Sequence, residues 1–281
     1  MHALVENFLE ETLLIWWAWI AVIAFVIETL FNGSRDHSFC GILLNVGSAF
    51  LVSVSSFVLG PLAMMCSYFL ARHFGSGLIT LNIFTGETVP AQIACLLLYV
   101  LIKDFFYYFW HRCQHKVGVL WDIHAVHHSD IAFNATTYLR QHWLNSPVQS
   151  FFVTIPMTLL FNLPPVTMFD TALVINIWLF FAHMNLRLEL GRLSWIATGP
   201  QLHRLHHSCK PEHADTNFAQ YFPIWDVLFG TYLHPKKGEF PPTGLSSGER
   251  IETLNALIFS PFQKWFGKIR TVLRLKSSLV G

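Results

Sequence analysis

Long apolar runs dominate the first two thirds of the chain. Residues 13 to 31 and 39 to 71 carry almost no charge, and residues 91 to 115, "AQIACLLLYVLIKDFFYYFWHRCQH", continue the pattern. Because about 20 apolar residues in a helix cross a bilayer core about 30 Å thick, each run predicts a spanning helix. The second run is broken by Gly60-Pro61, so we expect one long, tilted or kinked helix there.

The run from 91 to 115 is longer than a single span requires. As a helix it would rise about 37 Å at 1.5 Å per residue, so its C-terminal end is expected to protrude from the bilayer. Residues 147 to 183 contain two more apolar runs, separated by "NLPPV" at 162 to 166. Since residues before proline disfavour a helix, this segment predicts a helical hairpin that enters the membrane and returns.

The chain from residue 184 onward is mostly polar, and its tail is amphipathic. Between 258 and 276, apolar residues recur at helical spacing and five basic residues interleave with them. The pattern predicts a basic amphipathic helix on an anionic membrane surface, although an ordinary surface helix of the domain fits it as well. We therefore divide the chain into N-terminal transmembrane helices (1–90), a central region of membrane helices and histidine motifs (91–240) and a basic amphipathic tail (241–281).

The amino-acid composition favours a membrane protein. Hydrophobic residues make up 53% of the 281 positions and charged residues only 12%, whereas soluble domains carry about 25% charged residues. The predicted fold class is therefore all-α, a multi-span membrane helical bundle with a histidine-rich helical cap. Fifteen of the 18 Lys and Arg follow residue 110, so the cap should face the cytoplasm, beside a bacterial inner membrane or the endoplasmic reticulum. A net charge of +1 gives no indication of a nucleic-acid partner.

Eight of the 15 histidines fall into three clusters. On a helix, residues three or four positions apart share a face, with Cβ atoms about 5–6 Å apart, so their imidazoles can converge. Adjacent residues diverge by about 100° and can reach two different ions. Because a zinc site takes about four ligands, eight imidazoles favour a dinuclear metal site. The clusters are H-x-x-x-H (His111, His115), H-x-x-H-H (His124, His127, His128) and a second H-x-x-H-H (His203, His206, His207).

Other histidines and the cysteines are expected to have ordinary roles. Isolated histidines are usually surface residues or satisfied core residues. Cys113 and Cys209 lie beside histidine clusters, but no C-x-x-C spacing supports them as metal ligands. The histidines interpreted as ordinary are His2, His37, His73, His213 and His234.

Asp104 is an acidic residue in the apolar run, seven positions before His111. A carboxylate in a membrane helix is costly unless it is partnered. We expect it to accept the outer ring N–H of a ligand histidine, which would fix the tautomer of that ring. A pair with the neighbouring Lys103 is the alternative. Candidates for the same supporting role are Asp122, Asp226 and Asn185.

The order of these motifs on a membrane chain resembles the fatty acid hydroxylase/sterol desaturase superfamily of integral membrane di-iron enzymes. The resemblance covers residues 104 to 232 approximately. Within it, the sequence "TTYLRQ" is more similar to the alkylglycerol monooxygenase branch than to the sterol desaturases. The similar stretches are "DFFYYFWHRCQH" (104–115), "LWDIHAVHHSD" (120–130), "NATTYLRQH" (134–142), "HMN" (183–185), "GPQLHRLHHS" (199–208) and "NFAQYFPIWDVLFGTY" (217–232).

The resemblance implies that the eight clustered histidines bind two iron ions, with His183 as an additional ligand. It makes His142 a pocket or supporting residue, although Trp143 stands where many relatives have proline. The implied reaction uses O₂ to hydroxylate or desaturate a lipid, such as a fatty acyl chain, a sterol or an ether lipid. The chain has no His-Pro-Gly-Gly, G-x-G-x-x-G or Cys₄ pattern. Electrons are therefore expected from a separate NAD(P)H-linked reductase, cytochrome or ferredoxin.

Two other functions fit part of the pattern. A membrane zinc hydrolase would need a general base near its ligands, as in H-E-x-x-H, and no glutamate lies inside a histidine motif. A metal carrier or sensor without enzymatic activity would place its ligands near the membrane midplane, within broken spans. Here the clusters follow the ends of the apolar runs, which favours the oxygenase.

Overall fold

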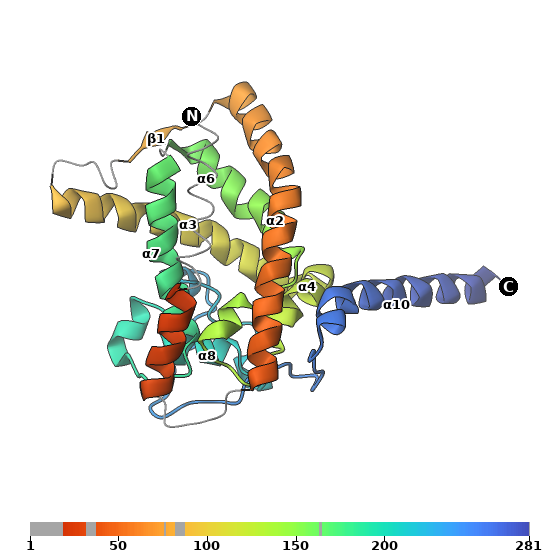
Figure 1. Cartoon of the computed structure of the whole chain (residues 1–281). Helices are drawn as coiled ribbons and strands as arrows, with labels where there is room; N and C mark the ends of the chain where they lie inside the picture. Colours follow the sequence, from red (N-terminus) through yellow and green to blue (C-terminus); the bar gives the residue numbers. More distant parts are fainter. Residues whose placement is uncertain (1–18, 32–37, 76, 82–87, 163–164, 281) are drawn as a thin grey trace.

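The structure, a computed structural model, is mostly helical over the residues that it describes, 19–31, 38–75, 77–81, 88–162 and 165–280 (Figure 1). One parallel pair of two-residue strands, β1 (Ile79–Thr80) and β2 (Phe161–Asn162), departs from the predicted all-α class within this part of the chain. The remaining elements are the helix Trp19–Phe31, α2 (Phe39–Phe74), α3 (Val89–Lys116), α4 (Gly118–His128), η1 (Ala135–Leu139), α5 (Asn145–Gln149), η2 (Ser150–Thr154), α6 (Ile155–Leu160), α7 (Pro165–His183), η3 (Gly191–Trp195), α8 (Pro200–His206), η4 (Pro211–His213), α9 (Ile224–Leu228) and α10 (Leu254–Val280).

The apolar runs form the long helices that their patterns predict. The 36 residues of α2 continue through Pro61 as one helix, and Ser38 caps its start by accepting the N–H of Gly41. The 28 residues of α3 begin at a cap made by Thr88. Both helices are long and apolar enough to cross a membrane, and their most apolar windows are only 22% and 11% buried. Of the first run, residues 13–18 lie outside the described part.

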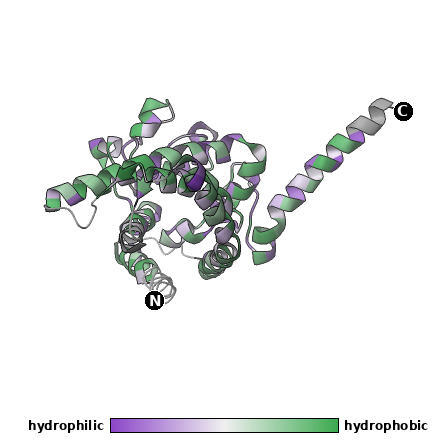
Figure 2. Cartoon of the chain, turned by 90° about the horizontal axis from the view of Figure 1, so that it is seen from above, coloured by the Kyte–Doolittle hydropathy of each residue, from purple (hydrophilic) through white to green (hydrophobic). Residues whose placement is uncertain are grey.

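The long helices do not all run in one direction. In Figure 1, α2 and α7 point along similar axes, whereas α3 crosses them at a steep angle, and the view from above in Figure 2 also shows α3 lying across the molecule. The C-terminal end of α3 leads into the body, where α4 packs against it. The multi-span arrangement of the apolar helices therefore stays a prediction.

The predicted hairpin is helical on both sides of its double proline. On the first side α5, the π-helical turn η2 and α6 follow one another without a break, and α7 forms the second side. Strand β2 ends α6 and pairs with β1, placing Phe161 opposite Ile79. Residues 163 and 164, at the turn itself, lie outside the described part of the chain.

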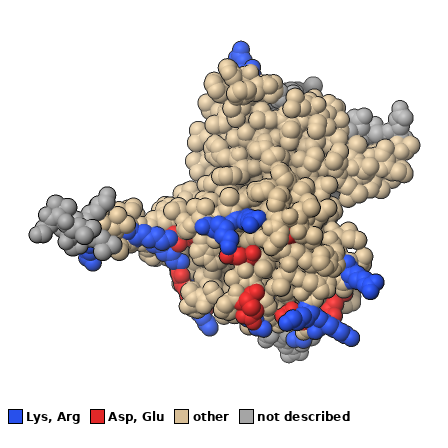
Figure 3. All heavy atoms as spheres, turned by 180° about the vertical axis from the view of Figure 1, so that it is seen from behind, with Lys and Arg blue, Asp and Glu red and all other residues tan. Residues whose placement is uncertain are grey.

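Charged side chains gather in one half of the molecule. On the face in Figure 3 they lie over the lower half, whereas the upper half is almost free of them. Helix α8 lies in this polar half, below α7, whereas α6 lies in the other half beside β1 (Figure 1). Buried hydrogen bonds tie the first two helices to the polar half: Glu28 accepts the N–H of Ala135 at 2.6 Å, and Asn45 donates to Asp130 at 3.1 Å.

The tail forms the predicted helix, α10, which leaves the body at about the level of α4 (Figure 1). Its first turns pack on the polar half, where Leu257 joins a core cluster with Val126. Farther along, Lys268 forms an ion pair with Asp122 of α4 at 2.5 Å. Beyond this contact the helix is exposed on all sides as far as its side chains are described, to Arg274. Apolar and polar residues alternate along it in Figure 2.

Candidate metal centre

All nine histidines predicted as ligands meet in the polar half, in two groups. Within each group the candidate ligand atoms all lie within 4.8 Å of one another. Eight of the nine side chains are buried, and His115 is partly buried. The first group contains His111, His115, His124, His128 and His206, and the second group contains His127, His183, His203 and His207.

Helix geometry divides the motifs between the two groups. The adjacent residues His127 and His128 diverge on α4, so each enters a different group, as the spacing predicts. His206 and His207 at the end of α8 separate in the same way. The last residue of α7, His183, completes the second group.

Nitrogens in the first group lie at metal-ligand spacing. His124 Nε2 lies 3.0 Å from His111 Nε2 and 3.1 Å from His128 Nε2. Two nitrogens that each lie about 2.1 Å from one ion, at a right angle, are about 3.0 Å apart. The Nε2 atoms of His115 and His206 are buried without a hydrogen-bond partner among the described residues. A metal ion at this position would satisfy them.

The second group repeats this geometry. His203 Nε2 lies 2.9 Å from His183 Nε2 and 3.2 Å from His207 Nε2, and His183 Nε2 lies 3.3 Å from His127 Nε2. The Nδ1 atoms of His127 and His183 donate to the backbone oxygens of Arg140 and Leu179, at 3.0 and 2.8 Å. Because a neutral imidazole has one donor, the two Nε2 atoms face each other as acceptors. A cation between the two lone pairs would satisfy both.

Outer partners in the first group come mainly from one loop. His111 Nδ1 donates to the Phe218 oxygen at 2.7 Å, and His206 Nδ1 donates to the Thr216 oxygen at 2.7 Å. His115 Nδ1 lies 3.6 Å from a carboxylate oxygen of Asp215. Such partners fix the tautomer and orient the free Nε2 atom.

Two carboxylates hold the loop of residues 216–222, which we call the carbonyl loop. Asp226 accepts the N–H groups of Phe218 and Ala219, at 2.7 and 2.9 Å. Asp104 accepts those of Gln220, Tyr221 and Phe222, at 2.8, 3.2 and 2.8 Å. The expected contacts from Asp104 and Asp226 to a ligand histidine are therefore wrong, and the hydrogen bonds to Asp104 come from the loop and not from Lys103. Loop N–H groups without secondary-structure partners take up the carboxylate instead.

Three other candidates also lie away from the metal ligands. Asp122 pairs with Lys268, and Asn185 accepts from Arg204 at 2.8 Å. His142 is fully buried outside both groups, where its Nε2 donates to the Ile258 oxygen at 3.1 Å and so helps to anchor α10. Tertiary contacts with α10 and Arg204, which no local pattern reveals, explain why these residues do not contact a ligand histidine.

The isolated histidines that the structure describes behave as ordinary residues. His213 is buried and lies 3.4 Å from Glu239, and His73 and His234 stack on aromatic rings. Cys113 and Cys209 are free and belong to neither group. His2 and His37 lie outside the described residues.

Burial keeps the clustered imidazoles neutral. On α4 and α8, removal from water lowers the pKa of six histidines well below its ordinary value, and neighbouring histidines lower it further. The nearby ring of His115 and the ammonium of Lys116 hold the pKa of Asp215 well below its usual range. Metal binding requires deprotonated imidazole, so the site is in the form that accepts an ion. The six histidines are His124, His127, His128, His203, His206 and His207.

The central part of the chain is similar to known lipid-oxidising proteins. The family profile described as fatty acid hydroxylase matches residues 96–231. Alkylglycerol monooxygenase of Xenopus tropicalis is 38% identical over 135 residues, or 48% of this chain and 29% of that protein. Ornithine lipid hydroxylase OlsE of Rhizobium tropici is 30% identical over 165 residues, or 59% of this chain and 49% of that protein. Cholesterol 25-hydroxylase of Homo sapiens is 35% identical over 145 residues, or 49% of each chain.

The matched segment contains both histidine groups and the two loop-holding carboxylates. The chain spans less than half the length of each of these three relatives. No solved structure gives a significant match. Residues 96–231 of this chain therefore match the fatty acid hydroxylase profile, and together with these relatives the match confirms the resemblance to the fatty acid hydroxylase/sterol desaturase superfamily.

Proposed function

We propose that this chain is a membrane-bound, O₂-dependent oxygenase that uses two iron ions to hydroxylate or desaturate a lipid. The observation that carries the proposal is the meeting of nine imidazoles in two groups, each with nitrogens at the spacing of ligands to one ion. The first group would hold one ion and the second group the other. The relatives described above are named as a monooxygenase and as hydroxylases, which supports O₂ chemistry.

Bound iron would supply the activation of O₂ and the oxidation of an unactivated C–H bond. Imidazole also suits zinc and copper, so the choice of iron rests on the family. Hydroxylation balances as RH, O₂, two electrons and two protons giving ROH and water. The chain's own residues orient the ligand rings through backbone carbonyls, and the rings of Phe133 and Tyr138 beside the second group exclude water.

The lipid that the comparisons favour is an ether lipid. Alkylglycerol monooxygenase of Xenopus tropicalis is the relative with 38% identity, over 48% of this chain. An alkylglycerol is therefore the first substrate that we propose, with an acyl lipid as the next. Electrons would come from a separate NAD(P)H-linked reductase, cytochrome or ferredoxin.

The distribution of charge supports a membrane placement. With α2 and α3 in the hydrocarbon, the almost charge-free half seen in Figure 3 would face lipid and the charged half the cytoplasm. The polar half carries the histidine groups, so a lipid would reach the metal site from the bilayer with its head group in the interface. In this placement α10 would lie along the membrane surface.

Metal content and product analysis test the proposal. The purified chain should contain two iron ions, and with O₂ and an electron source it should add one oxygen atom to an alkylglycerol, as detected by mass spectrometry. His127→Ala and His206→Ala should abolish turnover while the protein still accumulates in membranes. His234→Ala, at an exposed position outside both groups, is the matched control.

Each alternative function predicts a different result. One zinc ion per chain and turnover independent of O₂ would indicate a membrane hydrolase. Metal binding without any lipid product would indicate a carrier or sensor. Full activity of His206→Ala would refute the assignment of the first group.

A further inference from the structure

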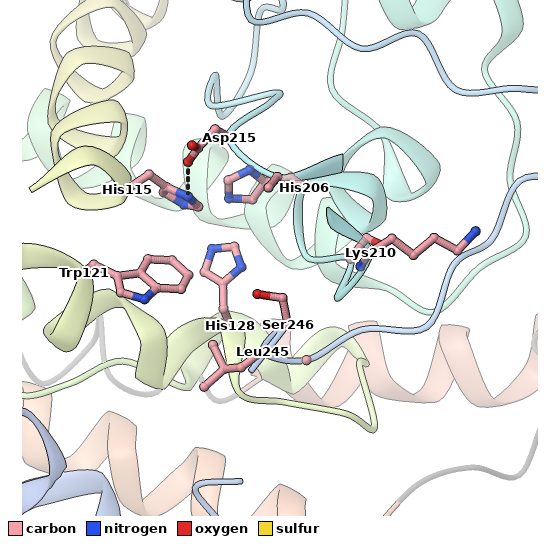
Figure 4. A pocket seen from close by; sticks show the side chains of 11 residues that line it. His115, Trp121, His128, His206, Lys210, Asp215, Leu245 and Ser246 are labelled. Carbon is pink, nitrogen blue, oxygen red and sulfur yellow. Dashed lines mark hydrogen bonds and ion pairs between the residues drawn. The ribbon is translucent and has the colours of Figure 1, made fainter. Parts of the chain in front are cut away.

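The two histidine groups have different surroundings. A cavity of about 150 Å³ adjoins the first group, and its described lining includes His115, His128 and His206 but no member of the second group (Figure 4). The second group is covered by aromatic rings instead. The ring of Phe133 lies 5.0 Å from that of His207, centroid to centroid. Of the two groups, only the first is reached through this cavity.

The cavity is polar and opens on the charged half of the molecule. Lys210 and Asp215 lie on its wall with Ser208 and Ser246, and Ser246 is exposed. Asp215 is already paired with Lys116 at 2.5 Å. The ammonium of Lys210 has no carboxylate partner among the described residues.

The cavity is too small for the lipid. Its volume of about 150 Å³ is well below the roughly 300–1,000 Å³ of pockets that hold drug-sized ligands. The substrate must reach the metal site by another route, which leaves this opening for the other reactants.

An indole ring connects the cavity to the first group. Trp121, in the first turns of α4, is partly exposed, and its ring lies 5.0 Å from that of His115 and 5.5 Å from that of His128. Figure 4 shows it on the wall of the cavity, beside these two rings. An aromatic ring in contact with two candidate ligands offers a short path for an electron from the surface.

We propose that the mouth of this cavity is the docking site of the electron donor, a small one-electron carrier protein with a carboxylate beside its prosthetic group. Lys210 pairs with that carboxylate, and the electron tunnels to the first group along a path that includes the ring of Trp121. This proposal rests on the proposed function, in which RH and O₂ take up two electrons and two protons to give ROH and water. Two reduced carriers are each oxidised by one electron per turnover, and the protons come from solvent.

The test uses an acidic [2Fe–2S] ferredoxin, with its NADPH-dependent reductase, as the donor probe. Ferredoxin binding to the detergent-solubilised full chain gives a Kd that does not depend on turnover. Alkylglycerol oxidation is then driven either by reduced ferredoxin or by hydrogen peroxide, which gives ROH and water from RH without added electrons. The matched controls are Lys237→Gln and Trp195→Phe, because Trp195 is 48% exposed and stacks on His234, outside both groups.

Binding and electron transfer should separate in the variants. Lys210→Gln should raise the Kd for ferredoxin about fivefold at low ionic strength, and added salt should remove the difference. Trp121→Phe should leave the Kd unchanged and lower ferredoxin-supported turnover about tenfold or more, with peroxide-supported turnover within about twofold. Trp121→Tyr, whose ring and hydroxyl reach farther than the ring of phenylalanine, should restore part of the ferredoxin-supported rate.

Either of two results would overturn the docking site. If Lys210→Gln binds ferredoxin as Lys237→Gln does, the carrier docks elsewhere. If Trp121→Phe and Trp121→Tyr lower ferredoxin-supported and peroxide-supported turnover alike, the indole only packs against the histidines. The proposed function would be refuted if the wild-type chain oxidises no lipid, either with O₂ and reduced ferredoxin or with hydrogen peroxide. The Kd values would still report on the docking site.

Discussion

Replacing Asp104 by asparagine tests whether a carboxylate that touches no histidine decides the metal content of the first group. Its Oδ1 accepts the N–H of Gln220, and its Oδ2 accepts those of Tyr221 and Phe222. An amide oriented toward Tyr221 and Phe222 loses the bond from Gln220 and weakens the other two by removing the charge.

The expected cost is large for this chain. Hydrogen bonds to a charged group are worth about 1.5–3 kcal/mol each, so we expect a loss of about 1.5–3 kcal/mol. That is a sizeable fraction of the roughly 5–15 kcal/mol by which folded proteins are stable. The loss falls on the carbonyl loop, where the oxygen of Phe218 orients His111.

Iron content measured for each chain, together with thermal unfolding, provides the assay. The second group takes its outer partners from Arg140 and Leu179, outside the carbonyl loop, so it should keep its ion. Asp104→Asn should therefore bind about one iron ion where the wild type binds two. Asp122→Asn, whose carboxylate pairs with Lys268 away from both groups, is the control and should bind two. A variant of Asp104 that keeps both ions despite lowered stability would refute the reasoning.

Two further predictions concern α10 and its anchor. Burial lowers the pKa of His142 to about 4; because the unfolded chain then binds the proton more readily, stability should fall as the pH decreases from about 6.5 toward 4. His142→Phe should show a smaller decrease across that window in acid unfolding, and an identical decrease would contradict the assignment. Replacing Lys264, Arg270 and Arg274 by glutamine should weaken the contact of α10 with anionic bilayers, so that a fluorophore at Phe266 is less protected from an aqueous quencher in nanodiscs containing phosphatidylglycerol. Equal protection in all-phosphatidylcholine nanodiscs would show that charge does not hold the helix there.

The sequence predicts those parts of the site that depend on helix geometry alone. The spacing of His124 and His128 places both on one face of α4, and the adjacency of His127 and His128 sends them to different groups. The apolar pattern also predicts α3, whose last turns carry His111. These features need only the 3.6-residue repeat, so they can be derived without knowing which helix packs against which.

Contacts between residues that are far apart in the sequence cannot be predicted from helix geometry alone. Asp104 is more than 100 positions from the loop that it holds, and Asp122 is as far from Lys268. A buried carboxylate near a histidine motif indicates only that it needs a hydrogen-bond donor. Either the ring N–H of a histidine or a backbone N–H can be that donor. His142 follows a histidine motif in the sequence, yet it serves α10 because that helix returns to the same place.

The carbonyl loop shows why backbone conformation is the least predictable part of the site. Asp215 and Asn217 both have left-handed backbone angles, with φ of 60° and 57°, which neither residue type prefers strongly enough to be recognised in a sequence. Asn217 is held by two hydrogen bonds to the backbone of Leu233, and the N–H groups of 218–222 turn toward Asp226 and Asp104. With the N–H groups committed to carboxylates, the oxygens of residues 216 and 218 are free to accept from the first histidine group. The side chain of Gln220 takes no part in these backbone bonds, so the metal site should depend on the two carboxylates far more than on the residue type at position 220.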